Sequence, residues 1–194
     1  MLESGGTCVS TTSPELPPKK IEETKLYLAH GVFMWLTWAV IGLLQIFTNR
    51  YWSHKWRWAR MTHMILGFFS GVLIIVAGAI ALKVKGEMKM GNSWHSKSGY
   101  VIFWMGLGLL VTAIVGNLIR LKLSLPWNTR GALLVSKAHR WLGRLIIIGS
   151  QFANGTGWYH FYKHHRDSPK VGLIVAGSTT GLFFLILIIG EINY

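Results

Sequence analysis

The chain is poor in cysteine and in charged residues. Among its 194 residues there is one cysteine, Cys8, so a disulfide within the chain and a zinc site built on several cysteines are both excluded. Only 14% of the residues are charged, whereas 51% are hydrophobic, a balance that is uncommon in soluble domains of this size. The apolar residues form long uncharged blocks without alternation, which indicates segments that cross a lipid bilayer.

Acidic residues are scarcer still, 7 against 20 lysines and arginines, and the net charge is +13. In a soluble chain this excess would suggest nucleic-acid binding, but no recognisable nucleic-acid-reading motif is present. The basic residues cluster between the apolar blocks, where they would meet anionic lipid headgroups. The sequence therefore predicts the lipid bilayer as a partner, and no nucleic acid.

Five membrane-spanning helices are predicted, at about residues 26–47, 58–82, 94–119, 133–158 and 171–189. Each has roughly the 20 apolar residues that a helix needs to cross hydrocarbon. The connecting segments are short, so neighbouring helices run antiparallel. Several tryptophans lie near the predicted ends, as in an interfacial aromatic belt, and Ser93 is placed to cap the third helix.

These segments predict an all-α integral membrane protein with three parts. Residues 1–24 form a polar N-terminal tail, which lacks the layout of a secretory signal or a mitochondrial transit peptide. Residues 25–158 form an antiparallel four-helix core, and residues 159–194 form a loop and one additional C-terminal transmembrane helix. Without Lys19 and Lys20, the two sides of the membrane carry 8 and 10 basic residues. This difference favours the second side, with the links before spans two and four, as the cytoplasmic or matrix side.

Four of the eight histidines occupy equivalent places, each near the start of its own predicted span: His30, His63, His95 and His139. Because successive helices alternate in direction, His30 and His95 fall at one membrane depth, and His63 and His139 at the other. In a four-helix bundle wound in chain order, these pairs come from diagonal helices and face the core, where cofactor sites are built. Opposed imidazoles can supply both axial ligands of a haem iron. We therefore predict two haem groups, with His30 and His95 as one axial pair and His63 and His139 as the other.

A second pattern supports this prediction. Gly67, Gly99 and Gly143 each follow a histidine by four residues, one helical turn away on the same face. A glycine there leaves room for a flat macrocycle. The first span differs, because Met34 occupies this position and is predicted to pack against the porphyrin.

Other interpretations exist for each feature alone. A single histidine in a membrane helix often bonds to a neighbouring helix, and spaced glycines often mark helix packing. A histidine-lined metal or proton pathway without haem is a further alternative. The joint pattern of four helices, one early histidine in each, favours haem. Asn117, Gln151 and Asn154 can donate hydrogen bonds that support the haem ligands or can bond between helices, and we favour the latter. The remaining histidines, including His160, are predicted to be solvated or at the headgroup level.

The histidine-bearing segments resemble the cytochrome b561 family, in particular the branch often fused to DOMON domains, although these residues contain no DOMON sequence. The resemblance lies in LAHGVFMWLTWAVIGLLQIFTNRYW, ARMTHMILGFFSGVLIIVAGAIAL, NSWHSKSGYVIFWMGLGLL and KAHRWLGRLIIIGSQFANGTG. It covers about residues 26–158, and KAHRWLGR is its most specific piece. It implies that the two groups are haem b, that electrons pass through them across the membrane, and that the chain is a reductase of ferric iron or monodehydroascorbate linked to ascorbate. The ascorbate-site motifs of the better-known branch are not matched.

Two functions follow as hypotheses. The first is a two-haem electron conduit with a small-molecule or protein donor and acceptor, in a plasma membrane or endomembrane by the resemblance. The second is a haem-containing accessory or anchor subunit of a larger membrane complex, for example in the mitochondrial inner membrane. A homodimer is compatible with either. The sequence shows no acid–base or nucleophilic apparatus.

Overall fold

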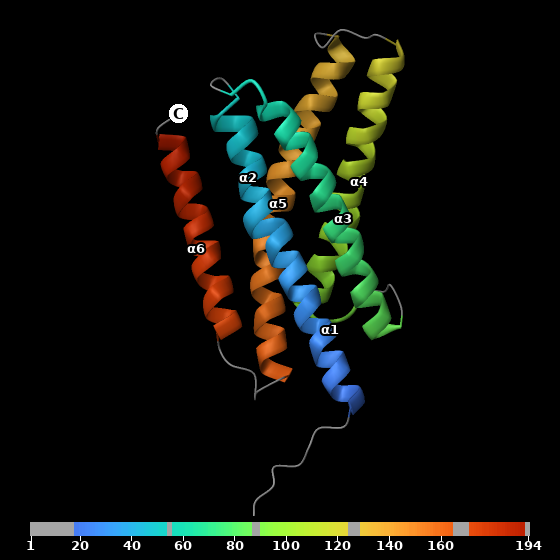
Figure 1. The fold of residues 1–194 in the computed structure, drawn as a ribbon, viewed down its shortest axis with the longest axis vertical. Helices are drawn as coiled ribbons and strands as arrows, with labels where there is room; N and C mark the ends of the chain where they lie inside the picture. The colour runs from blue at the N-terminus through green and yellow to red at the C-terminus, as the bar shows by residue number, and fades with distance from the viewer. Residues whose placement is uncertain (1–17, 54–55, 87–89, 124–128, 165–170, 193–194) are drawn as a thin grey trace, which may run out of the picture.

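The computed structural model describes residues 18–53, 56–86, 90–123, 129–164 and 171–192 (Figure 1). Every regular element in this part of the chain is helical. The elements are α1 (Pro18–Trp35), η1 (Leu36–Ile41), α2 (Gly42–Ile46), η2 (Phe47–Tyr51), α3 (Ala59–Lys85), α4 (Trp94–Leu123), α5 (Arg130–His164) and α6 (Val171–Ile192).

The first four elements form one continuous rod. The residues at its internal junctions keep right-handed helical dihedrals, for example φ −59° and ψ −42° at Gly42, and the wider π-helical turns of η1 and η2 lie between α-helical turns. The rod begins at Pro18, well before the predicted start of the first span near residue 26. Proline is favoured in the first helical turn, and Glu22 forms an ion pair with Lys83 of α3 at 3.8 Å. The part of the predicted tail before Pro18 lies outside the described residues.

The ends of the helices follow local sequence signals. Gly86 ends α3 with a φ of 76°, and its N–H donates to the Leu82 carbonyl at 2.8 Å. This left-handed conformation favours glycine, which has no Cβ. Ser93 precedes α4, and its hydroxyl oxygen accepts a hydrogen bond from the Ser96 N–H at 3.1 Å. The predicted cap at Ser93 is therefore confirmed.

Three helical stretches are long and apolar enough to cross a membrane, namely Ile21–Tyr51, Ala59–Lys85 and Trp94–Ile119. Large apolar side chains such as Phe68 and Leu118 are exposed on them, as expected for helices that face lipid. The predicted fourth span lies within α5, whose first half carries charged side chains. The apolar part of α6, Gly177–Ile192, is shorter. The fourth and fifth spans therefore remain predictions.

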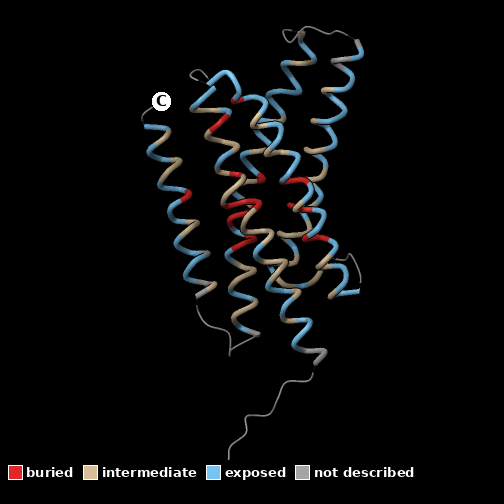
Figure 2. The backbone as a smooth tube through the Cα atoms, viewed as in Figure 1, coloured by how far each residue is buried: buried red, intermediate tan, exposed pale blue. Residues whose placement is uncertain are grey.

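The packing of the helices places two pairs of them opposite each other. α1 packs against α3 and α5, and α4 also packs against α3 and α5. The pairs α1 and α4, and α3 and α5, therefore lie across a common centre, while α6 packs outside against α5 and η1 (Figure 1). Buried residues gather at mid-height of the molecule (Figure 2), in a cluster formed by Trp38, Ile74, Ile102, Ile146 and Ala153.

Hydrogen bonds attach α6 to the rest of the molecule. The Trp35 indole donates to the Thr179 hydroxyl at 2.9 Å, and Glu191 pairs with Arg50 and accepts from the Tyr51 hydroxyl. Between these contacts, the buried Gln151 amide donates to the Trp38 carbonyl at 3.2 Å. The Gln151 carbonyl oxygen accepts from Thr180 at 3.4 Å. The predicted bonding of Gln151 between helices is confirmed.

Replacement of Gln151 by leucine should lower the stability of the fold in detergent. It removes a buried donor to the first helical rod and an acceptor for α6, and such interhelical bonds are worth about 0.5–2 kcal/mol in membrane proteins. Thermal unfolding followed by circular dichroism measures the change. Asn117→Leu is the matched control, because the Asn117 amide bonds to Ala113 of its own helix. An equal loss in both variants would contradict a role for Gln151 between helices.

Candidate functional site

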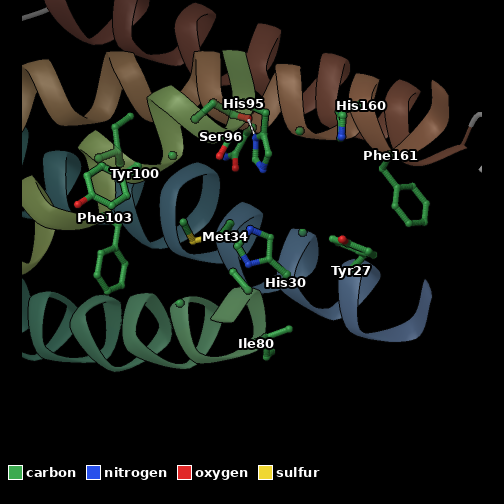
Figure 3. Close-up of a pocket in the computed structure, with 18 of the residues that line it drawn as sticks. Tyr27, His30, Met34, Ile80, His95, Ser96, Tyr100, Phe103, His160 and Phe161 are labelled. Atoms are coloured by element: carbon green, nitrogen blue, oxygen red, sulfur yellow. Dashed lines mark hydrogen bonds between the residues drawn. The ribbon is translucent and has the colours of Figure 1, made fainter. Parts of the chain in front are cut away.

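His30 of α1 and His95 of α4 form the first of two histidine pairs. Their ring centres lie 6.2 Å apart with an angle of 82° between the ring planes. The two side chains extend toward each other from opposite helices (Figure 3). The structure thus brings together the two residues that the alternation of helix direction predicts as partners.

His63 of α3 and His139 of α5 form the second pair. Their ring centres are also 6.2 Å apart, and the ring planes are 83° from each other. These two helices again lie across the centre of the helix packing. The two pairs therefore have the same geometry, although they come from four different helices.

The 6.2 Å between ring centres can be compared with the distance expected for two imidazoles bound to one metal ion. An imidazole nitrogen bonds to a first-row metal at about 2 Å and lies about 1.1 Å from its ring centre, so two opposed ligands have ring centres about 6 Å apart. Edge-to-face packing of two rings covers a wider range, about 4.5–7 Å. The observed 6.2 Å is compatible with both arrangements.

Three of the four rings bind a backbone carbonyl of a neighbouring helix through Nδ1. His30 donates to Ala77 at 2.9 Å, His63 to Gln45 at 3.3 Å and His95 to Ala153 at 3.0 Å. A carbonyl only accepts, so Nδ1 carries the proton and Nε2 keeps its lone pair. This is the usual arrangement of a metal-ligating histidine. Among the described residues, the fourth ring, His139, has no hydrogen-bond partner.

The same hydrogen bonds show how far apart the two histidine pairs lie along the helices. His30 and Gln45, whose carbonyl holds His63, are 15 residues apart on one rod. His63 and Ala77, whose carbonyl holds His30, are 14 residues apart on α3. At 1.5 Å per residue both intervals correspond to about 20 Å, which is two thirds of the hydrocarbon thickness of a bilayer. The pairs therefore lie near opposite ends of the helices.

A cavity surrounds the His30–His95 pair. Its volume is about 200 Å³, and it is partly open to the surroundings. Its walls come from α1, α3, α4 and α5 and are largely apolar, with Met34 and Phe103 among them (Figure 3). At its edge, the Lys85 ammonium donates to the Ser96 hydroxyl at 2.9 Å. The two rings therefore face a largely apolar space between the helices.

The glycines predicted to give clearance lie in open space. A Cβ added at Gly67, Gly99 or Gly143 would meet no atom within 4 Å, and Gly99 lines the cavity, as does Met34. Their predicted packing against a macrocycle is compatible with this openness and stays a prediction.

One glycine of the site was not predicted. A Cβ at Gly157 of α5 would come within 2.8 Å of the His95 ring, so only a residue without a side chain leaves this ring its place. Gly157 lies one turn after Ala153, the residue that accepts the His95 hydrogen bond. In the sequence, the four-residue spacing of Ala153 and Gly157 was the only indication of this contact.

Three further polar residues were the subject of predictions, and one of these predictions is contradicted. The Asn117 amide bonds to the Ala113 carbonyl of its own helix at 2.8 Å, so the prediction of a bond between helices is wrong for it. Asn154 is buried beside the cavity, and its amide nitrogen has no partner among the described residues. His160 is exposed and lines the cavity, and its place in solvent or at the headgroup level stays a prediction. His54 and His165 lie outside the described residues.

In the described part of the chain, no group of three or more His, Cys, Asp and Glu side chains is arranged to hold a metal. A haem iron needs only two axial ligands from the protein, the number that each pair supplies. Comparison with known proteins finds no match to this chain among protein-family models, curated proteins or solved structures.

Proposed function

We propose that this chain is a membrane protein that transfers electrons across the bilayer through two bis-histidine b-type haems. His30 and His95 hold one haem and His63 and His139 hold the other. The observation that carries the proposal is the pair of matched geometries, with ring centres 6.2 Å apart at both places. The separation of the pairs by about 20 Å along the helices supports a path between the two membrane faces.

The residues of the chain would bind and orient the two groups. Hydrogen bonds from Nδ1 to backbone carbonyls hold three of the imidazoles in the tautomer that presents Nε2 to a metal. Largely apolar walls surround the His30–His95 site. Bound haem would supply an iron centre that gains and loses one electron, at a potential set by its ligands and surroundings.

The proposal also includes the electron donor and the electron acceptor. The resemblance to the cytochrome b561 family favours an ascorbate-linked reductase of ferric iron or monodehydroascorbate. Basic side chains at the end of the molecule that contains His63 and His139 suit an anionic donor, with Arg144 over the Trp141 ring and Arg57 over the Trp58 ring.

We expect the purified chain to contain two haems. A pyridine haemochrome measurement should give about two haem b per chain, and dithionite should produce a b-type α-band. Absence of the α-band in protein expressed with sufficient haem would refute haem binding and leave a histidine-lined metal or proton pathway.

Electron transfer is tested separately in vesicles. With the protein in liposomes that contain a trapped ferric chelate, external ascorbate should reduce the trapped iron, and liposomes without protein give the background. Two haems without such transfer, together with stable co-purification of a respiratory complex, would instead assign the chain as an accessory or anchor subunit.

A further inference from the structure

Two buried hydrogen-bond donors in the lining of the His30–His95 cavity have no acceptor within the part of the chain that the structure describes. They are the indole Nε1 of Trp38 and the amide Nδ2 of Asn154, and neither atom has a partner among the described residues. Both residues are 8% exposed. A buried donor without an acceptor costs about 1–3 kcal/mol, so native structures nearly always satisfy it with protein, water or ligand.

Both donors belong to residues that line the same cavity. Trp38 and Asn154 line the cavity that contains His30 and His95. Trp38 lies two helical turns beyond His30 on the first rod, and Asn154 directly follows Ala153, whose carbonyl holds the His95 ring. The two donors thus come from different helices and flank one histidine pair.

The surroundings show why the donors stay without protein partners. The Trp38 ring is packed within the buried apolar cluster of Ile74, Ile102 and Ile146, which offers no acceptor atoms. The carbonyl of Trp38 is already used by Gln151. Nearby carbonyls on α5 are also engaged, as that of Ala153 accepts from both His95 and Thr156. A group bound in this cavity can supply the acceptor that the described residues do not offer.

We infer that Trp38 and Asn154 are positioning residues whose N–H groups donate hydrogen bonds to the group held by His30 and His95 and raise its reduction potential. This inference rests on the proposed function. The reduced state of a ligated iron carries one more negative charge than the oxidised state. N–H groups that donate hydrogen bonds to the group stabilise that charge strongly in a buried, weakly polar site. Loss of a donor therefore lowers the potential.

The test uses variants that remove one N–H each in a background with a single haem. His139→Ala leaves the His30–His95 haem as the one observed. In that background, Trp38→Phe keeps an aromatic ring without the N–H, and Asn154→Leu keeps a side chain of similar size without the amide. Spectroscopic redox titration should show a threefold to tenfold lower ratio of reduced to oxidised haem at a given potential. For a one-electron couple this corresponds to a shift of about 30–60 mV to lower potential.

Two controls separate this inference from its premise. Asn117→Leu, whose amide bonds within α4, should leave the potential of the same haem unchanged. The Trp38 and Asn154 variants made in a His30→Ala background should leave the His63–His139 haem unchanged. Haem bound with an unaltered potential in both variants would overturn the inference and retain the proposed function. Absence of haem from the unsubstituted protein would overturn the proposed function.

Discussion

Replacement of His63 by alanine should remove about one of the two haems and leave the His30–His95 haem in place. The imidazole of His63 is one of only two axial ligands proposed for its site, and its ring is held by the Gln45 carbonyl at 3.3 Å. Alanine offers no ligand and leaves His139 alone opposite it. The two sites lie about 20 Å apart along the helices and do not touch. Loss of the haem at one site should therefore leave the other site intact. Pyridine haemochrome analysis should fall from about two haems per chain to about one.

The reciprocal variant and a matched control define the pairing. His30→Ala should remove the other haem, and the double variant should bind none. His160→Ala is the control, because His160 lines the His30–His95 cavity but belongs to neither histidine pair. This variant should retain both haems. Retention of both haems in His63→Ala, or loss of both, would contradict the pairing.

Replacement of Gly157 by valine should abolish the His30–His95 haem while the other haem remains. A Cβ at this position would approach Cε1 of the His95 ring to 2.7 Å and Nδ1 to 2.8 Å. These distances are too short for nonbonded atoms, so the ring has to move. Movement breaks its hydrogen bond to Ala153, at 3.0 Å, and changes its position relative to His30. Haem content should fall by about half, with no loss in the site formed by His63 and His139.

Gly155 provides the matched control for this substitution. It lies two residues earlier on α5, and a Cβ there would meet no atom within 4 Å. Gly155→Val therefore imposes the same cost of a β-branched residue in a helix without contact with His95. Equal haem loss in the two valine variants would show that helix propensity, and not the position of the His95 ring, controls occupancy.

Much of this arrangement could be predicted because its signals are local. Apolar blocks predicted the helices, and three of them meet the length and hydropathy needed to cross a membrane. Ser93 was identified as a cap from its residue type and position. The pairing of His30 with His95 followed from helix direction alone, since short links force antiparallel neighbours and early residues then alternate between the two ends.

Errors arose where local signals were weak. The first helix starts at Pro18, within the predicted polar tail, because charged residues support a helix as well as a loop. The bond of Asn117 to its own helix could not be told from one to a neighbour, since an amide reaches either. The π-helical turns of η1 and η2 leave no recognisable mark in the residues.

The four histidines show the division between sequence and tertiary structure. Their residue type, their places in four helices and their pairing were determined by the sequence, because periodicity and alternation depend only on the order of residues. Their orientation was decided by tertiary structure. It depends on the backbone carbonyls of Ala77, Gln45 and Ala153. Every residue has a backbone carbonyl, so residue type does not indicate which carbonyl will accept the hydrogen bond. The space left by Gly157 and the unsatisfied donors of Trp38 and Asn154 likewise arise only when separate helices pack together.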